Sequence, residues 1–191
     1  MTESNRETAV RRALRAADSR RSTVSLVAAV VAVATYVSLS GRSLPAYVAS
    51  HFAGDGAANA YMPRSAYVGF MLVVSISLPL VIFASARILP HVPASLLNLP
   101  NRDYWLAPER RAQTYAFLQD HTARFATLLA VFLGFVHWRV VAANALQRPM
   151  LEPIVFVGGL LVFLVALVVW IALLAAHFRR DDSKPHTHRP A

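Results

Sequence analysis

Four stretches without a charged side chain decide what this chain can fold into. The first covers the twenty residues 22–41, and the second covers residues 65–86. A helix of about 20 residues is roughly 30 Å long, which matches the hydrocarbon core of a bilayer. Residues 153–176 are almost continuously apolar and also reach this length.

The remaining stretch is shorter, because only the fourteen residues 125–138 are uncharged. Arg124 and Arg139 flank it, and their long side chains can carry the guanidinium groups to the two membrane surfaces. We therefore predict an all-α integral membrane four-helix bundle with spans at about 23–41, 65–86, 122–143 and 153–177. Residues 1–22 then form a basic arm, residues 23–178 the membrane domain, and residues 179–191 a tail.

The first stretch also resembles a secretory signal peptide, since basic residues precede it. It is longer than the roughly 7–15 apolar residues of such peptides. No convincing small-x-small cleavage site follows before Pro45. We therefore expect a retained transmembrane helix.

The distribution of positive charge predicts the orientation. The chain carries 19 Lys+Arg against 10 Asp+Glu, yet its mean hydropathy of +0.45 is too high for a soluble nucleic-acid-binding protein. Fifteen of the Lys and Arg residues lie in segments 1–22, 87–124 and 177–191, and four lie in 42–64 and 139–152. The positive-inside rule then predicts that both termini and the middle loop are cytoplasmic.

The basic arm has two interpretations. Val10, Leu14 and Ala17 recur at helical spacing, which favours a helix lying on anionic lipid. A solvated arm that only sets the topology explains the composition equally well. The basic residues concerned are Arg6, Arg11, Arg12, Arg15, Arg20 and Arg21.

The predicted outer loop contains a candidate metal or ligand site. His51 lies four residues before Asp55, a spacing that would direct both side chains to one ion if the segment were helical. Gly54 and Gly56 flank the acid and argue against a helix. A hydrogen-bonded His–Asp turn is therefore the interpretation that we favour over a metal site.

The same loop carries a family resemblance, through Leu44-Pro45, His51-Phe52, Gly54 and Pro63-Arg64. These residues resemble the short signature of a bacterial domain of unknown function found in SdpI-type immunity and signalling membrane proteins. In that family the signature follows the first transmembrane helix, as it does here, and the match covers about residues 25–85. The resemblance implies a small protein of the bacterial inner membrane with a role in immunity or signalling.

The predicted cytoplasmic loop contains a second distinctive motif, which resembles a stretch in one subgroup of these proteins. The motif comprises Asn98, Pro100, Asn101, Arg102, Asp103, Tyr104, Trp105, Pro108, Glu109 and Arg110. Pro108 and Glu109 are typical of a helix start. A helix from there to about Leu146 would be about 57 Å long, so we expect the third helix to extend into the cytoplasm.

The charged residues of this motif could pair in a network around Tyr104 and Trp105. The residues concerned are Arg102, Asp103, Glu109, Arg110 and Arg111. Ion pairs of this kind near membrane surfaces are more often structural than functional. We therefore favour a structural cap over a binding site.

Two polar residues of the third predicted helix extend the outer candidate site. His137 and Asn144 are seven residues apart and lie on one helix face near its outer end. With His51 and Asp55 they could form one outward-facing site for a metal or small polar ligand. The alternative, which we favour, is a hydrogen-bonded tie between the outer loop and the helices, because nothing local fixes a metal geometry.

Other residues argue against several kinds of function. The spans contain no acidic residue at mid-membrane, which argues against proton-coupled transport. Pro79 is expected to kink the second helix, and the tail histidines His186 and His188 are interpreted as solvated. The absence of cysteine excludes disulfides, thiolate zinc sites and cysteine nucleophiles.

Three hypotheses follow for the function. The first is a non-enzymatic membrane protein similar to the SdpI-type family, and the second is an accessory or structural subunit of a larger integral-membrane complex. The third is a metal-dependent or ligand-binding site at the outer face, formed by His51, Asp55 and His137. No cofactor is predicted, and the expected partners are the bilayer, anionic lipids at the arm and an integral-membrane protein, with no nucleic acid.

Overall fold

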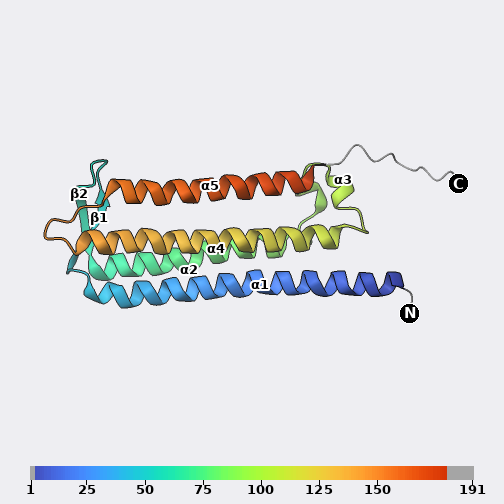
Figure 1. The fold of residues 1–191 in the computed structure, drawn as a ribbon, viewed down its shortest axis with the longest axis horizontal. Coiled ribbons are helices and arrows are strands. Elements are labelled where there is room, and N and C mark those ends of the chain that lie inside the picture. The colour runs from blue at the N-terminus through green and yellow to red at the C-terminus, as the bar shows by residue number, and fades with distance from the viewer. Residues whose placement is uncertain (1–2, 180–191) are drawn as a thin grey trace.

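Four long helices run side by side along the molecule (Figure 1). The computed structural model describes residues 3–179, with side chains from residue 17 onward. The long helices are α1 (Glu3–Ser40), α2 (Arg64–Ile88), α4 (Arg111–Asn144) and α5 (Pro153–Phe178). Each has a segment long and apolar enough to cross a membrane, so the four apolar helices that the sequence predicted are present.

Helix α1 continues without interruption through the boundary predicted at residue 22. Its 38 residues correspond to a length of about 57 Å, well beyond the bilayer core. The basic arm is therefore the first part of the same helix as the first span. The side chains of Arg6, Arg11, Arg12 and Arg15, and the tail residues His186 and His188, lie outside the described part, so lipid contact by the arm stays a prediction.

Helices α1, α2 and α4 pack closely together, whereas α5 packs chiefly against α4. Small residues allow α1 and α4 to approach, because Ala126 and Ala130 are fully buried against Leu26 and Val30. In contrast, Phe178 at its last turn is the one buried residue of α5. The long helices therefore form a three-helix bundle with a fourth helix attached along one side.

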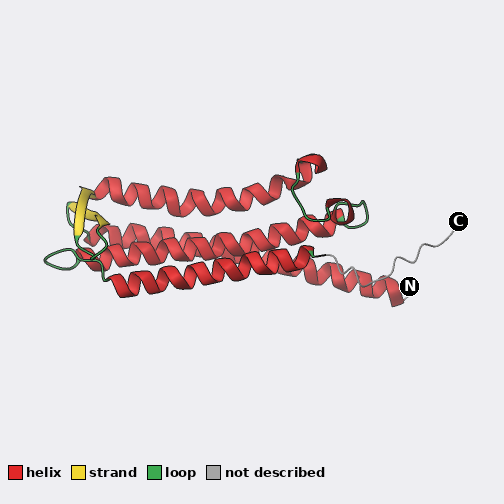
Figure 2. Ribbon diagram, turned by 90° about the horizontal axis from the view of Figure 1, so that it is seen from above, coloured by secondary structure: helices red, strands yellow, loops and turns green. Residues whose placement is uncertain are grey.

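The segment between α1 and α2 is an antiparallel hairpin of β1 (Tyr47–Phe52) and β2 (Ala58–Pro63), drawn in yellow in Figure 2. The prediction of an entirely α-helical chain is wrong at this place. Gly56 has a φ of +87°, which lets the chain reverse between the strands. Val48 of β1 is fully buried against the helices, which holds the hairpin on the bundle.

The connection between α2 and α4 contains two short 3-10 turns, Leu89–His91 and Ala94–Leu96, and the short helix α3 (Arg102–Trp105). The predicted helix start at Pro108 is wrong, since α4 begins at Arg111. The carbonyl oxygen of Ala107 accepts hydrogen bonds from the backbone N–H groups of Arg110 and Arg111, both at 2.9 Å, so a separate turn precedes the helix.

The two ends of the molecule differ in construction. The hairpin lies at one end, here named the hairpin end, and α3 lies at the other, here named the α3 end (Figure 1). The start of α1 and the end of α5 also lie at the α3 end. The 34 residues of α4 span about 51 Å, so this helix is longer than a bilayer core, as predicted.

Candidate functional site

A fully buried histidine joins three helices near the hairpin end. His137 of α4 lies 2.8 Å, through Nε2, from the hydroxyl oxygen of Ser40 in α1. Its Nδ1 lies 3.0 Å from the hydroxyl oxygen of Tyr67 in α2. The ring also meets Tyr36 edge to face, with the ring centroids 5.3 Å apart.

The partners of this histidine define which ring nitrogen carries the proton. The Ser40 hydroxyl donates to the carbonyl oxygen of Tyr36 at 2.6 Å, so its oxygen is left to accept the Nε2–H of His137. Nδ1 is then the acceptor for the Tyr67 hydroxyl. His137 thus has a hydrogen-bond partner at both nitrogens, and its role here is to connect helices.

Asn144 ties the hairpin to the end of α4. Its side-chain oxygen accepts the backbone N–H of Ala49 at 2.8 Å, and its side-chain N–H group donates to the Ala49 carbonyl oxygen at 3.0 Å. The amide therefore pairs with β1 as a neighbouring strand would. The contacts are those of the hydrogen-bonded tie that the sequence favoured.

The other two members of the predicted outer site serve the hairpin itself. Nδ1 of His51 lies 2.5 Å from the side-chain oxygen of Asn59, at an exposed position. Asp55 accepts the backbone N–H of Ala57 at 2.9 Å, which is the hydrogen bond of a turn. Asp55 thus closes a hydrogen-bonded turn, and His51 of β1 contacts a residue of the paired strand β2.

The predicted combination of His51, Asp55 and His137 does not form a three-ligand group. Within residues 3–179, as far as their side chains are described, no group of three or more His, Asp or Glu residues is arranged to hold a metal. The physical reason is that His137 points into the helix interface while His51 lies on the exposed hairpin. Phe52 packs against the apolar cluster at this end, and Gly54 has open space around it.

An arginine of α4 holds the start of α5. Arg139 is about nine-tenths buried and pairs with Glu152 at 3.5 Å. Its guanidinium also lies over the ring of Trp138, 5.0 Å from the centroid. The Arg139 head group is thus paired with the residue that precedes α5, and its expected position at the membrane surface stays a prediction.

The motif at the α3 end closes the chain against the last turn of α5. Trp105 donates its indole N–H to the carbonyl oxygen of Phe178 at 3.3 Å, and the Thr114 hydroxyl donates to the Trp105 carbonyl oxygen at 2.8 Å. These contacts link α3, α4 and α5. They support the structural cap that the sequence favoured.

The predicted charge network of this motif forms only in part. Arg102 pairs with Asp103 at 3.5 Å and donates to the Ser95 carbonyl oxygen at 3.2 Å. Arg110 lies over the Tyr104 ring, 4.1 Å from its centroid. Asn101, which precedes α3, takes a left-handed φ of +51°. Glu109 makes no ion pair with the residues described. Asn98 makes no side-chain hydrogen bond with them, and Pro100 and Pro108 have no side-chain donor or acceptor.

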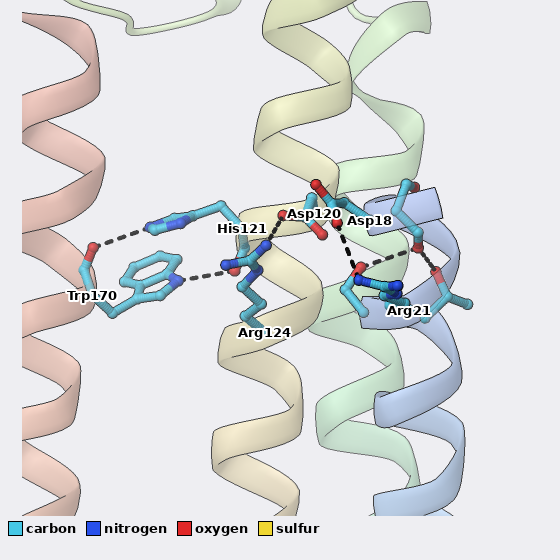
Figure 3. Close-up of polar contacts among 9 residues, drawn as sticks. Asp18, Arg21, Asp120, His121, Arg124 and Trp170 are labelled. Atoms are coloured by element: carbon cyan, nitrogen blue, oxygen red, sulfur yellow. Dashed lines mark hydrogen bonds and ion pairs between the residues drawn. The ribbon is translucent and has the colours of Figure 1, made fainter. Parts of the chain in front are cut away.

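A row of aromatic rings joins α4 to α5 next to the cap at the α3 end. His121 and Trp170 stack with centroids 4.7 Å apart, and each ring N–H donates to the other residue's carbonyl oxygen, at 3.0 and 2.9 Å (Figure 3). Phe117 stacks on His177 at 3.5 Å and on His121 at 5.3 Å. The row is a helical stripe at positions 117, 121 and 125, a spacing of four that the sequence displays.

Two acid–arginine pairs lie at the same level, one within α4 and one within α1 (Figure 3). Asp120 pairs with Arg124 at 2.8 Å, and Asp18 lies 4.0 Å from Arg21. Asp120 Oδ1 is buried and has no hydrogen-bond partner among the described residues. Sequence reasoning missed this cluster, because these residues lie near the ends of spans and were interpreted as signals of orientation.

Residues of these pairs line two hollows. The larger, of about 470 Å³, extends toward the α3 end, where Tyr104, Trp105 and Phe117 line it. The smaller, of about 310 Å³, lies between α1 and α4 and contains Arg21 and Arg124. Asp18 lines both. These hollows are the candidate ligand site at the α3 end.

Comparison with family models, with curated proteins and with solved structures gives no match to this chain. The functional argument therefore depends on the chemistry of these side chains and on the resemblance of the two loop motifs.

Proposed function

We propose that the chain is a non-enzymatic, multi-pass protein of the bacterial inner membrane, of the immunity or signalling kind implied by its SdpI-type motifs. Its active surface is helix α5, which binds a second membrane-embedded protein. The distribution of positive charge supports an orientation with both termini and α3 in the cytoplasm, since fifteen of 19 Lys and Arg residues lie in the segments at that end.

The observation that carries this proposal is the exposure of α5. This helix is the most apolar of the four, and none of its most apolar window is buried within the chain. Ile154, Val162 and Val168 are 83%, 71% and 64% exposed. An apolar surface of this size faces either lipid or another apolar protein, and the proposal assigns it to a protein.

The polar residues within the spans support a non-enzymatic role. The hydroxyls of Ser38, Ser77 and Thr127 donate to carbonyl oxygens one turn earlier on their own helices. His137 and Asn144 have structural partners. Ser75 differs from these, because its hydroxyl is buried one turn before Pro79 in α2 without a partner in the described region.

The second candidate is an accessory subunit of a larger integral-membrane complex. The same exposed helix supports it, and the two differ in how the partner is bound. A constitutive subunit co-purifies in fixed stoichiometry in mild detergent, whereas an immunity or signalling protein is recovered largely alone and captures its partner transiently.

Photo-crosslinking in living cells tests the proposal. A benzophenone amino acid at Val162 or Val168 is expected to give one discrete adduct with another membrane protein. Val81 of α2, which is 63% exposed, is the matched control and should give none. Adducts of equal yield at Val81 and at the α5 positions, or none at any position, would refute a partner at α5.

A further inference from the structure

A shallow hollow at the hairpin end lies between the start of α2 and the end of α1, with the 3-10 turn Gly41–Ser43 that follows α1. Its volume is about 330 Å³. The residues that line it are Ser38, Gly41, Arg42, Arg64, Ser65 and Val68. Two of them are arginines and none is acidic, whereas both hollows at the α3 end are lined by Asp18. This hollow therefore has a positive charge that no residue of its lining offsets.

Backbone carbonyl groups that follow α1 hold the side chain of Arg64 in place. Its Nη1 donates to the carbonyl oxygen of Arg42 at 3.2 Å and to that of Leu44 at 3.0 Å. These bonds use both hydrogens of Nη1, so the three N–H groups on Nε and Nη2 remain. Two N–H groups on one edge of a guanidinium match two oxygens of a phosphate. No carboxylate of the described residues forms an ion pair with Arg64, so this edge can bind an external anion.

The side chain of Arg42 is exposed, and it makes neither an ion pair nor a hydrogen bond with the described residues. All five of its N–H donors are thus available to a ligand. Arg21 and Arg124 at the α3 end differ in this respect, since each pairs with an aspartate of its own helix. An anion in the hollow at the hairpin end therefore meets two guanidinium groups whose charges the chain leaves uncompensated.

The two arginines lie where the apolar parts of their helices end. Each directly borders an uncharged stretch, residues 22–41 in one case and residues 65–86 in the other. Charged side chains at such positions lie at the headgroups of a bilayer. Ser38 and Val68 are four residues inside these stretches, about 6 Å further along the helix axes. In a membrane that covers these spans, the hollow therefore extends from the phosphate level into the apolar layer.

Exposed apolar side chains continue from the hollow along both helices. Val31 lies two turns from Ser38 on the same face of α1, and Ile76 lies three turns from Ser65 on the same face of α2. Both apolar side chains are exposed. Helices α1 and α2 also pack less closely on each other than either packs on α4. This surface can bind an acyl chain of a lipid whose phosphate occupies the hollow, whereas a free phosphate would not contact it.

We infer that this hollow binds an anionic phospholipid of the leaflet at the hairpin end, through the phosphate of its headgroup. The phosphate lies between Arg42 and Arg64, and one acyl chain follows the exposed apolar side chains of α1 and α2. No carboxylate lines the hollow, so the ammonium group of a zwitterionic headgroup finds no partner there and is repelled by the two arginines. A headgroup with a net negative charge, such as phosphoglycerol, is therefore preferred over phosphoethanolamine.

Native mass spectrometry of the purified, delipidated full-length chain with defined lipids tests this inference. Phosphatidylglycerol is expected to bind about fivefold more tightly than phosphatidylethanolamine. The variant R42Q should bind phosphatidylglycerol about fivefold more weakly than the wild type, because it removes one uncompensated charge. It should also unfold like the wild type, since the Arg42 side chain has no hydrogen bond or ion pair to lose. The matched control R148Q removes the same charge from an exposed position at the same end and should change lipid affinity less than about twofold.

The variant S65W separates a built site from general attraction between charges, because it fills the hollow and keeps both arginines. It should bind phosphatidylglycerol at least fivefold more weakly than the wild type. The inference is overturned if S65W binds this lipid as the wild type does, if R42Q loses no more affinity than R148Q, or if the two lipids bind equally well. Complete displacement of the lipid by inorganic phosphate at equal concentration would also overturn it, because the hollow would then be a site for free phosphate.

Discussion

Replacing His137 by phenylalanine tests the three-helix junction without opening a cavity, because the ring volume is nearly kept. The hydroxyl of Ser40 loses the Nε2–H but still donates to the Tyr36 carbonyl oxygen, so it stays satisfied. The hydroxyl of Tyr67, which is 3% exposed, loses its acceptor. We expect H137F to lower the free energy of unfolding by about 2 kcal/mol.

This magnitude combines two contributions. A buried donor left without an acceptor costs about 1–3 kcal/mol. Hydrogen bonds between membrane helices contribute on average only about 0.6 kcal/mol each, so their loss adds little and the total stays near the middle of that range. No term for lost packing volume is included, since phenylalanine fills the site.

The double variant gives the decisive measurement, because the effect of Y67F should change sign. In the wild type, Y67F removes the donor to Nδ1 and should destabilise the chain by about 1 kcal/mol. In H137F it removes the orphaned hydroxyl and should restore about 1 kcal/mol. Unfolding in detergent, followed by tryptophan fluorescence, measures all four proteins. Equal destabilisation by Y67F in both backgrounds would refute the hydrogen-bond assignment, while S77A, whose hydroxyl bonds its own helix, should stay within about 0.5 kcal/mol.

The remaining predictions concern the hairpin and α5. G56A should destabilise the chain by more than about 2 kcal/mol, because φ is +87° and a Cβ would lie 2.0 Å from the Leu151 carbonyl oxygen. A Cβ added at Gly54 meets nothing within 4 Å, so G54A should be tolerated. Thermal unfolding of the two variants tests this difference. N144A removes both bonds to Ala49 and should increase amide hydrogen exchange across residues 47–63 at least tenfold, and unchanged exchange would mean that apolar packing alone holds the hairpin. W170F keeps the stacking on His121 but loses one hydrogen bond of 2.9 Å, so it should loosen α5 by about 1 kcal/mol, visible as faster exchange in α5 than in α2.

The spans could be predicted from sequence because a bilayer imposes a length that charges interrupt. Arg64 and Arg87 bracket the predicted second span, and α2 covers Arg64–Ile88. The hairpin could not be predicted in the same way. Its two strands are six residues each, and glycines with an acid between them are equally typical of an irregular turn.

The sequence predicted which residues of α4 face the outer loop, but it did not predict their partners. A spacing of seven places His137 and Asn144 on one helix face, but it does not identify what lies opposite that face. The partners of Asn144 are the backbone atoms of Ala49, and those of His137 are Ser40 and Tyr67. None of these carries a sequence signal, since a backbone group is the same at every residue and hydroxyls are common in spans.

The two ends of the molecule use polar groups in ways that bear on function. Around His137 at the hairpin end the hydrogen-bond partners are neutral and the ring is fully buried with a partner at each nitrogen, so a ligand could bind to it only by displacing an existing hydrogen bond. At the α3 end the guanidinium groups of Arg21 and Arg124 are exposed and each has one ion pair, so a ligand adds hydrogen bonds without removing any. Of these two polar clusters, the one at the α3 end is therefore the one that can accept a ligand without losing a hydrogen bond, and its arginines line the smaller hollow between α1 and α4.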